Sequence, residues 1–311
     1  MSGSPKLGWA DLPRPLRDRI EGELGGTVVE AEVQESGFSP GAPLRVRLAS
    51  GKRTFVKAAT EEINAQTVEL YRNEAQVSER LPVLPEVPRL RTWFESPPWV
   101  VLIFADAEGT PPTIPWQHAE LVRVLEALAD LASRLTPAPV SGLPTITAKH
   151  ADHFDGWSRL AQDPVRLQAA DDDGWLTAHL EQLTVLAGRW SAAAAGTTLL
   201  HADIRADQLL LTDERVYLVD WAHACVGADF LDPLLFFPSI VLDGGPGFDE
   251  LIALSPQTRE TDPAELAAVA SAAASYFIER STHPPPPGLP TVRDFQRRQG
   301  QVLLDWLEPQ L

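Results

Sequence analysis

The chain has 311 residues and a formal net charge of −17 at pH 7, from 26 Lys and Arg against 43 Asp and Glu. Its 44% hydrophobic and 22% charged residues are typical of a folded protein and exclude a disordered one. The length predicts about two domains. The acidity argues against nucleic-acid and anionic-membrane partners, and it favours either simple solubility or the attraction of a cationic small molecule.

Cysteine usage and the lack of a long apolar run bear on the compartment. The single cysteine, Cys225, excludes an intrachain disulfide and a cysteine-rich zinc site. Residues 1–6 lack a signal-peptide pattern, and the longest apolar run, 99–105, is far below the roughly 20 residues of a membrane span. We therefore expect a cytoplasmic protein, and the abundance of Ala, Leu, Arg and Pro indicates a bacterial one.

The first hundred residues predict a small β-rich part that contains one long helix. A short amphipathic helix is predicted first, over 12–24, with Pro13 and Pro15 near its start. Alternating or apolar runs then predict strands, two of which the turn 49–52 joins in a hairpin. The predicted strands cover 27–33, 44–48, 54–57, 90–94 and 99–104, and the long helix covers 61–81.

After residue 109 the pattern becomes helical. A short β segment is predicted within 199–219, and the proline run 284–287 predicts a stiff connector before the last helix. The acidic run 171–173 predicts the solvated start of a helix, with contact to a cationic substrate as the alternative. The predicted helices cover 116–135, 148–162, 174–195, 248–255, 263–280 and 291–308.

The segment 199–233 carries residues suited to phosphoryl transfer. His201, Asp203, Arg205 and Gln208 fall between two apolar runs, and Asp220 follows a third. Phosphoryl transfer uses a carboxylate near the acceptor hydroxyl, oxygen ligands for Mg²⁺ and a cation near the γ-phosphate. Apolar runs on both sides would hold such a loop in place.

This segment resembles the catalytic loop of aminoglycoside phosphotransferases and of related kinases such as choline kinase. Their pattern is His-Gly-Asp, four residues, Asn, and then a hydrophobic strand that ends in Asp. Here the pattern runs from His201-Ala202-Asp203 through Gln208 to Asp220.

The resemblance implies a role for each matching residue. Asp203 would be the catalytic base, and Asp220 and Gln208 would be the metal ligands. Arg205 lies where protein kinases place a lysine that contacts the γ-phosphate, which implies the same role for Arg205. His201 and Asp232 would support the loop.

The N-terminal part supplies residues for binding the nucleotide. Lys57 lies on a predicted strand, and Glu74 follows 17 residues later on the predicted helix. In kinase-like folds a strand lysine, oriented by a helix glutamate, holds the α- and β-phosphates. The turn 35–41 falls where a phosphate-covering loop belongs, and 104–107 falls at the expected hinge. The further candidate nucleotide contacts are therefore Ser36, Gly37, Phe104, Ala105 and Ala107.

Together these observations predict an α+β protein with a bilobal protein kinase-like fold. A nucleotide-binding lobe is expected over 1–105, and a mainly helical lobe with the catalytic loop and the acceptor site over 106–311. The expected activity is transfer from ATP or GTP, with Mg²⁺, to a hydroxyl of a small molecule. A cationic antibiotic is one candidate acceptor, which would make the protein a resistance kinase. The chain is expected to act as a monomer or homodimer.

Two other interpretations remain open. Gln208 stands where the family has Asn, Ala228 stands where it often has Asp, and the turn 35–41 is poor in glycine. These departures allow a catalytically impaired pseudokinase that binds nucleotide or serves as a scaffold. The same catalytic residues would also serve a kinase of a primary metabolite such as choline, a sugar or an amino alcohol.

Overall fold

The computed structural model describes residues 6–35, 37, 40–286 and 289–311. Contacts divide the chain into two units. Unit 1 comprises residues 1–111 and 207–223, and unit 2 comprises residues 112–206 and 224–311. A hairpin from the second half of the sequence is therefore part of unit 1.

An antiparallel sheet of five strands, in the order β1-β2-β3-β5-β4, forms the centre of unit 1. It confirms the five strands predicted there. β3 continues three residues beyond its predicted end, because Ala58–Thr60 pair with β5, so Lys57 lies inside the strand. The strands are β1 (Val28–Val33), β2 (Ala42–Leu48), β3 (Arg53–Thr60), β4 (Leu90–Ser96) and β5 (Trp99–Ala105).

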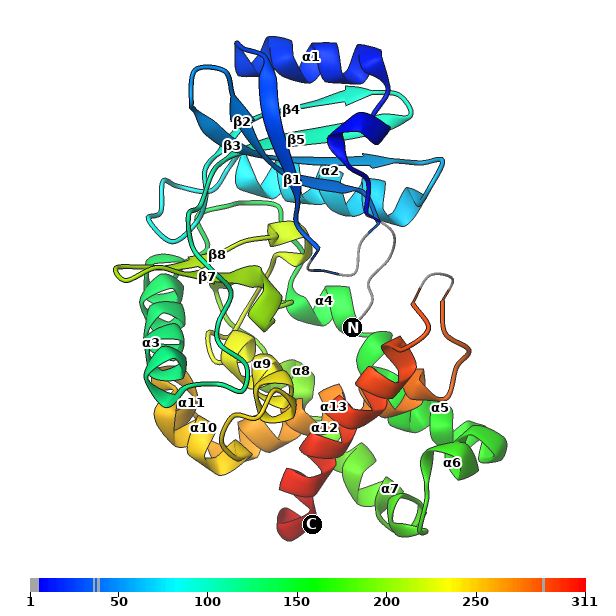
Figure 1. The fold of residues 1–311 in the computed structure, drawn as a ribbon. Helices are drawn as coiled ribbons and strands as arrows, with labels where there is room; N and C mark the ends of the chain where they lie inside the picture. The colour runs from blue at the N-terminus through cyan, green and yellow to red at the C-terminus, as the bar shows by residue number, and fades with distance from the viewer. Residues whose placement is uncertain (1–5, 36, 38–39, 287–288) are drawn as a thin grey trace. The chain divides into compact units, whose positions relative to one another are not determined.

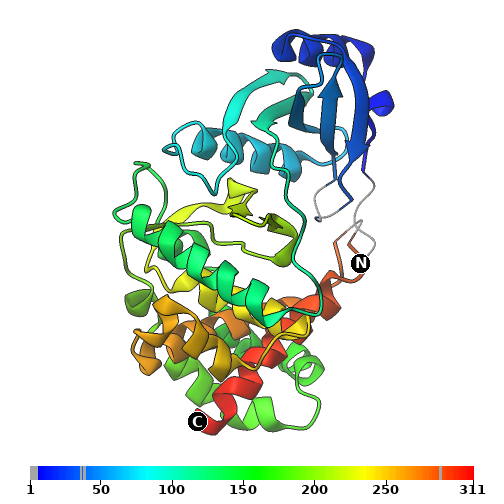
Figure 2. The same cartoon turned by 60° about the vertical axis from the view of Figure 1, so that its left-hand side comes forward.

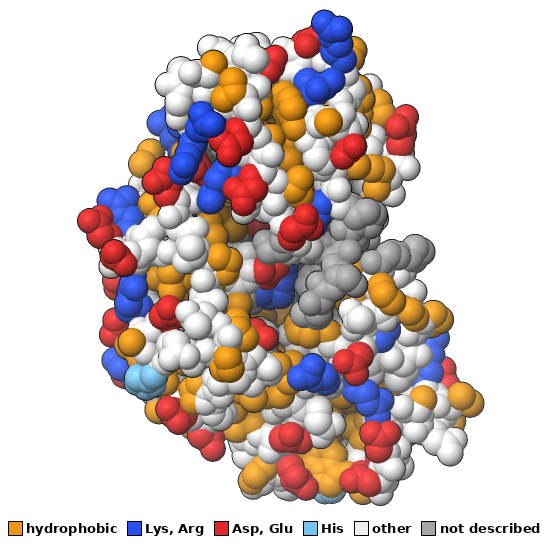
Figure 3. All heavy atoms as spheres, in the orientation of Figure 1, with side chains coloured by type: hydrophobic (Ala, Val, Ile, Leu, Met, Phe, Trp, Pro, Cys, Tyr) orange, Lys and Arg blue, Asp and Glu red, His pale blue; other side chains and the backbone are white. Residues whose placement is uncertain are grey.

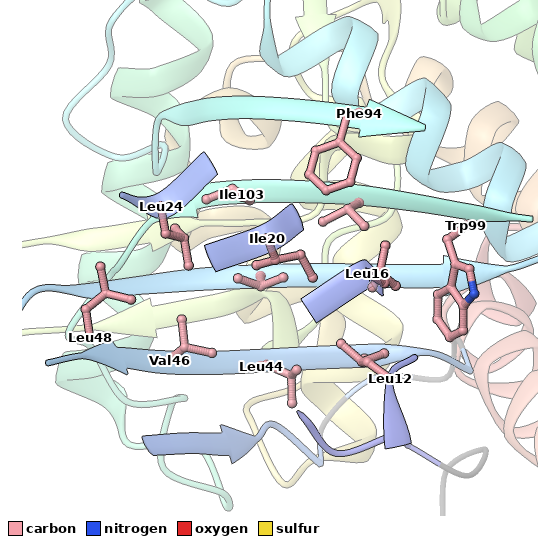
Figure 4. Close-up of a cluster of buried hydrophobic side chains, with 14 residues drawn as sticks. Leu12, Leu16, Ile20, Leu24, Leu44, Val46, Leu48, Phe94, Trp99 and Ile103 are labelled. Carbon is pink, nitrogen blue, oxygen red and sulfur yellow. The ribbon is translucent and has the colours of Figure 1, made fainter. Parts of the chain in front are cut away.

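Helices cover both faces of this sheet (Figures 1 and 2). α1 (Arg14–Leu24) packs its leucines and isoleucine on one face, together with Val56, Ala58 and Ile103 (Figure 4). α2 (Ala65–Ser78) packs on the other face, together with Ala59 and Leu102. Because successive strand residues point to opposite faces, Lys57 points to the α2 side.

α2 begins four residues later than the periodicity predicts. The Asn64 side chain accepts a hydrogen bond from the Thr67 amide at 2.8 Å and caps the helix. The capped start fixes the phase of the helix, so Tyr71 and Glu74 both lie on its buried face.

A short hairpin, β7 (Leu209–Leu211) and β8 (Val216–Leu218), completes unit 1. Thr110 forms a bridge with Leu211, and the Leu218 amide donates to the Glu86 carbonyl at 2.8 Å. These backbone bonds hold the hairpin to the segment between α2 and β4 and to the segment after β5.

Unit 2 is mainly helical around α12 (Pro263–Ser281), most of whose residues are buried. Gly156 lies so close to α12 that a Cβ there would stand 2.1 Å from the Ser275 carbonyl oxygen. β6 (Thr198–Leu200) and β9 (Cys225–Gly227) pair in a two-stranded ladder. The other helices are α3 (His118–Arg134), α4 (Ile146–His150), α5 (Gly156–Gln162), α6 (Pro164–Ala170), α7 (Trp175–Ala187), α8 (Trp190–Ala193), α9 (Leu231–Leu242), α10 (Phe248–Leu254), α11 (Pro256–Arg259) and α13 (Val292–Leu307).

The prediction of one continuous helix over 148–162 is wrong, because this stretch contains α4, a 3₁₀ turn over His153–Asp155 and α5. The helix predicted over 174–195 is likewise two helices, since α7 ends before Gly188 and α8 follows. Among the described residues, no helix is both long enough and apolar enough to cross a membrane.

Candidate nucleotide site and catalytic loop

An ion pair between Lys57 and Glu74 joins β3 to α2. The Lys57 ammonium donates to the Glu74 carboxylate and, at 3.2 Å, to Asp220 Oδ1. It also lies 4.6 Å from the centre of the Tyr71 ring, within the range of a cation–π contact. Three of the residues predicted to bind nucleotide and metal therefore meet at one ammonium group in unit 1.

Burial sets the electrostatics of this group. Lys57 is 8% exposed and Glu74 is 2% exposed. Burial alone would lower the pKa of Lys57, but the carboxylates of Asp220 and Glu74 outweigh it and raise that pKa. Burial raises the pKa of Glu74 to about 7, although the Lys57 charge acts in the opposite direction. The lysine is thus held charged at a fixed point, where it can meet an anion.

Gln208 and Asp220 lie at the same end of the β7–β8 hairpin. Gln208 immediately precedes β7, Asp220 follows β8 by two residues, and the Val219 amide donates to the Gln208 carbonyl at 3.0 Å. Their side chains offer a carboxylate and an amide oxygen, the donors that a hard divalent cation prefers. The donor chemistry therefore fits Mg²⁺, and Asp220 links these donors to Lys57.

The predicted phosphate-covering loop is described in part. Ser36 lies outside the described residues. Gly37 has a left-handed φ of +85°, and a Cβ there would stand 3.8 Å from Asp207 Oδ2. Gly37 thus lies close to Asp207, the residue before Gln208.

The predicted hinge has some of its backbone groups already engaged. The Ala105 amide donates to the Arg89 carbonyl at 2.8 Å, and the Phe104 carbonyl accepts from Thr54 Oγ1 at 2.6 Å. The Ala107 carbonyl accepts from Arg45 at 2.7 Å. An adenine ring that bonded to this segment would use the Ala105 carbonyl or the Ala107 amide.

The first part of the predicted catalytic loop, with Asp203 and Arg205, belongs to unit 2. Arg205 Nη1 lies 2.6 Å from Asp203 Oδ2, so the predicted base and the predicted γ-phosphate contact form an ion pair. Asp232 holds the start of this loop, because its carboxylate accepts hydrogen bonds from the backbone amides of His201 and Ala202, each at 2.8 Å. This contact is the supporting role expected for Asp232.

Two residues near Asp203 were not singled out from the sequence. Burial is the main cause that raises the pKa of Tyr276, and the Asp203 carboxylate also raises it. Burial lowers the pKa of Lys149, which the Asp203 charge opposes. Both side chains therefore lie within electrostatic range of the predicted base. The scarcity of lysine in the chain is the signal that could have drawn attention to Lys149.

The model of a family described as the phosphotransferase enzyme family (APH) matches residues 37–269. No curated protein sequence matches the chain.

Solved structures of kinases share the fold. A choline/ethanolamine kinase family protein from Mesorhizobium loti is 16% identical, with 94% of each chain covered and a TM-score of 0.57. An amicoumacin kinase in complex with AMP-PNP, Ca²⁺ and Ami is 11% identical, with 89% of this chain and 88% of that chain covered and a TM-score of 0.54. These likenesses confirm the predicted protein kinase-like fold.

Proposed function

Because the chain belongs to the phosphotransferase enzyme family, we propose that it transfers the γ-phosphoryl group of ATP or GTP to a hydroxyl of a small molecule. Membership confirms the predicted family and the predicted small-molecule phosphotransferase. The observation that carries the finer proposal is the buried Lys57, held between the carboxylates of Glu74 and Asp220. This arrangement suits a polyphosphate that binds with a divalent cation.

The residues of unit 1 would bind the nucleotide. Lys57, oriented by Glu74, would contact the α- and β-phosphates, and the loop at Gly37 would cover them. Asp220 and Gln208 would hold Mg²⁺, which supplies neutralisation of the phosphate charge when it is bound. Backbone groups at Ala105 and Ala107 would position the base.

The residues of unit 2 would act on the acceptor. Asp203 would accept the proton of the acceptor hydroxyl as that oxygen bonds to the γ-phosphorus. The bond from the γ-phosphorus to the β,γ-bridging oxygen would break, and the nucleoside diphosphate would leave with that oxygen. Arg205, paired with Asp203, would stabilise charge on the transferred group.

The acceptor is proposed by class alone. Cationic antibiotics, choline, sugars and amino alcohols all carry the hydroxyl that this chemistry requires. A mass-shift screen of these compounds with the protein, ATP and Mg²⁺ would identify the acceptor as the species that gains one phosphate.

Asp203→Asn tests the assignment of the base, since the amide keeps the size of the side chain and cannot take the proton. We expect kcat for the acceptor found in the screen to fall about 10²–10⁴-fold. The Kd for magnesium-bound nucleotide should stay within about twofold, because Asp203 would not hold the metal. Asp213→Asn, on the exposed turn of the β7–β8 hairpin, is the matched control. Undiminished transfer in Asp203→Asn would remove Asp203 from the mechanism.

A further inference from the structure

Lys6 is a lysine in a chain that uses very few. Of its 26 basic residues only four are lysines: Lys6, Lys52, Lys57 and Lys149. Lys6 precedes the residues 37–269 that the family model matches. Lys6 therefore lies outside the matched region.

Backbone contacts place Lys6 beside Gly41, the residue before β2, and β2 is the neighbour of the strand β3 that carries Lys57. Lys6 forms a parallel bridge with Gly41, and the Leu7 amide donates to the Gly41 carbonyl at 2.8 Å. A Cβ at Gly41 would stand 2.8 Å from the Ala58 carbonyl oxygen and 3.4 Å from the Tyr71 hydroxyl. Residue 41 can approach Ala58 of β3 this closely only because it is glycine.

The same contacts lead to the Lys57 ammonium. Tyr71, whose hydroxyl faces Gly41, has its ring under Lys57 Nζ, and Ala58 is the next residue of β3. Lys6, Gly41 and the Lys57–Tyr71 pair are therefore neighbours within unit 1.

The charges around Lys6 are those of the candidate phosphate site. Burial and the Lys57 charge lower the pKa of Lys6, whereas the carboxylates of Asp207, Glu35 and Asp220 raise it. Lys6 thus adds a second ammonium group to the charges of the candidate phosphate site.

We propose that Lys6 is a second phosphate-binding lysine, which contacts the polyphosphate of the bound nucleotide together with Lys57. This inference rests on the proposed function, because it takes a nucleotide as the ligand. It adds a phosphate contact from the segment that precedes α1.

Amine labelling tests the proposal directly, because only four side chains can react. The protein is acetylated briefly with and without magnesium-bound AMP-PNP, and the labelling rate at each lysine is measured by peptide mass spectrometry. We expect nucleotide to slow labelling of Lys6 and Lys57 at least fivefold. Lys52, exposed in the β2–β3 turn, is the internal control and should label at the same rate in both states.

Variants separate phosphate contact from a structural role. We expect Lys6→Met to raise the Kd for magnesium-bound AMP-PNP about tenfold by calorimetry. Lys6→Arg should keep the Kd within about threefold, and Lys52→Met should leave it unchanged. The Kd for adenosine, which has no phosphate, should be the same in Lys6→Met and in the wild type.

The other outcomes distinguish failure of the inference about Lys6 from failure of the proposed function. If the wild type binds nucleotide but Lys6 is neither protected nor needed for affinity, the inference fails and the proposed function stands. Equal losses for AMP-PNP and adenosine in Lys6→Met would show a structural role and also overturn it. If the wild type binds no nucleotide, both the proposed function and the inference fail.

Discussion

Two residues of the catalytic segment adopt a left-handed backbone although neither is glycine. Ala202 has a φ of +62° and Asp220 a φ of +71°. This region costs an ordinary L-residue about 1–2 kcal/mol, and aspartate tolerates it better than alanine. At Ala202 this conformation is held by the hydrogen bonds that the backbone amides of His201 and Ala202 donate to the Asp232 carboxylate. The positive φ at this position explains why the family pattern has glycine there.

Ala202→Gly should therefore stabilise the protein. Glycine adopts a positive φ without the Cβ clash, so we expect the free energy of unfolding to rise by about 1 kcal/mol. Urea denaturation measures the change. Ala178→Gly, at an exposed position inside α7, is the control of opposite sign and should lose about 1 kcal/mol. A loss of stability in Ala202→Gly would show that the backbone is not strained there.

At this scale the sequence predicted part of the site. The strand and helix that carry Lys57 and Glu74 could be recognised, and their ion pair is present. The ion pair from Lys57 to Asp220 joins residues 163 positions apart, and no local pattern encodes it. The position of Lys6 beside Gly41 is equally non-local, because it depends on how the N-terminal segment folds back.

Among the elements, α7 illustrates how an acidic run can be structural. Asp171 accepts from the amides of Gly174, Leu176 and Thr177, and Asp172 pairs with Arg297 at 2.7 Å. Partial burial of Asp171 would raise its pKa, but the hydrogen bonds from the Thr177 hydroxyl and from these amides outweigh burial and lower that pKa. The structure thus shows the predicted helix start at this run.

Asp171→Ala should cost about 1–2 kcal/mol of unfolding free energy at pH 7. Because the folded-state pKa of Asp171 is lowered, its contribution is complete above its ordinary value near 3.8 and is lost as the pH falls through the folded value. The difference from wild type should therefore shrink at pH 3. Urea denaturation at both pH values measures it. Asp172→Ala, which breaks an exposed ion pair, should cost less than about 1 kcal/mol. Equal losses in the two variants would contradict the capping role.

Elements with strong periodicity were predicted well, and those without it were not. α9 was missed because it contains Pro233 and Pro238 and is buried on most sides, so it shows little amphipathic period. The break after α4 was missed because the residues of the 3₁₀ turn continue an apparently helical composition. β3 was predicted too short because its last residues gain their pairing from β5.

At the scale of the whole molecule, the net charge of −17 is not gathered into one acidic patch on the face in view. Figure 3 shows acidic and basic side chains interspersed over that face. The side chains on that face therefore do not favour a cationic antibiotic over the other candidate acceptors. The fold class followed from the change of pattern near residue 109, because the strands come first in the chain and most helices come after them.

The proposed function requires the nucleotide to bind in unit 1 with a divalent metal at Asp220. Calorimetric titration of ATP, with Mg²⁺ and again with EDTA, measures whether it does. Asp220→Asn is the variant to compare with wild type, since asparagine tolerates the left-handed backbone and removes only the charge. Asp213→Asn on the same hairpin is the control.

We expect the wild type and Asp213→Asn to bind ATP at least tenfold more tightly with Mg²⁺ than with EDTA. Asp220→Asn should lose most of that difference. If neither ATP nor GTP bound in either condition, the fold would remain but the proposed activity would not, and a pseudokinase would be the better interpretation. Binding that depends equally on Mg²⁺ in Asp220→Asn would contradict the assignment of the metal to Asp220.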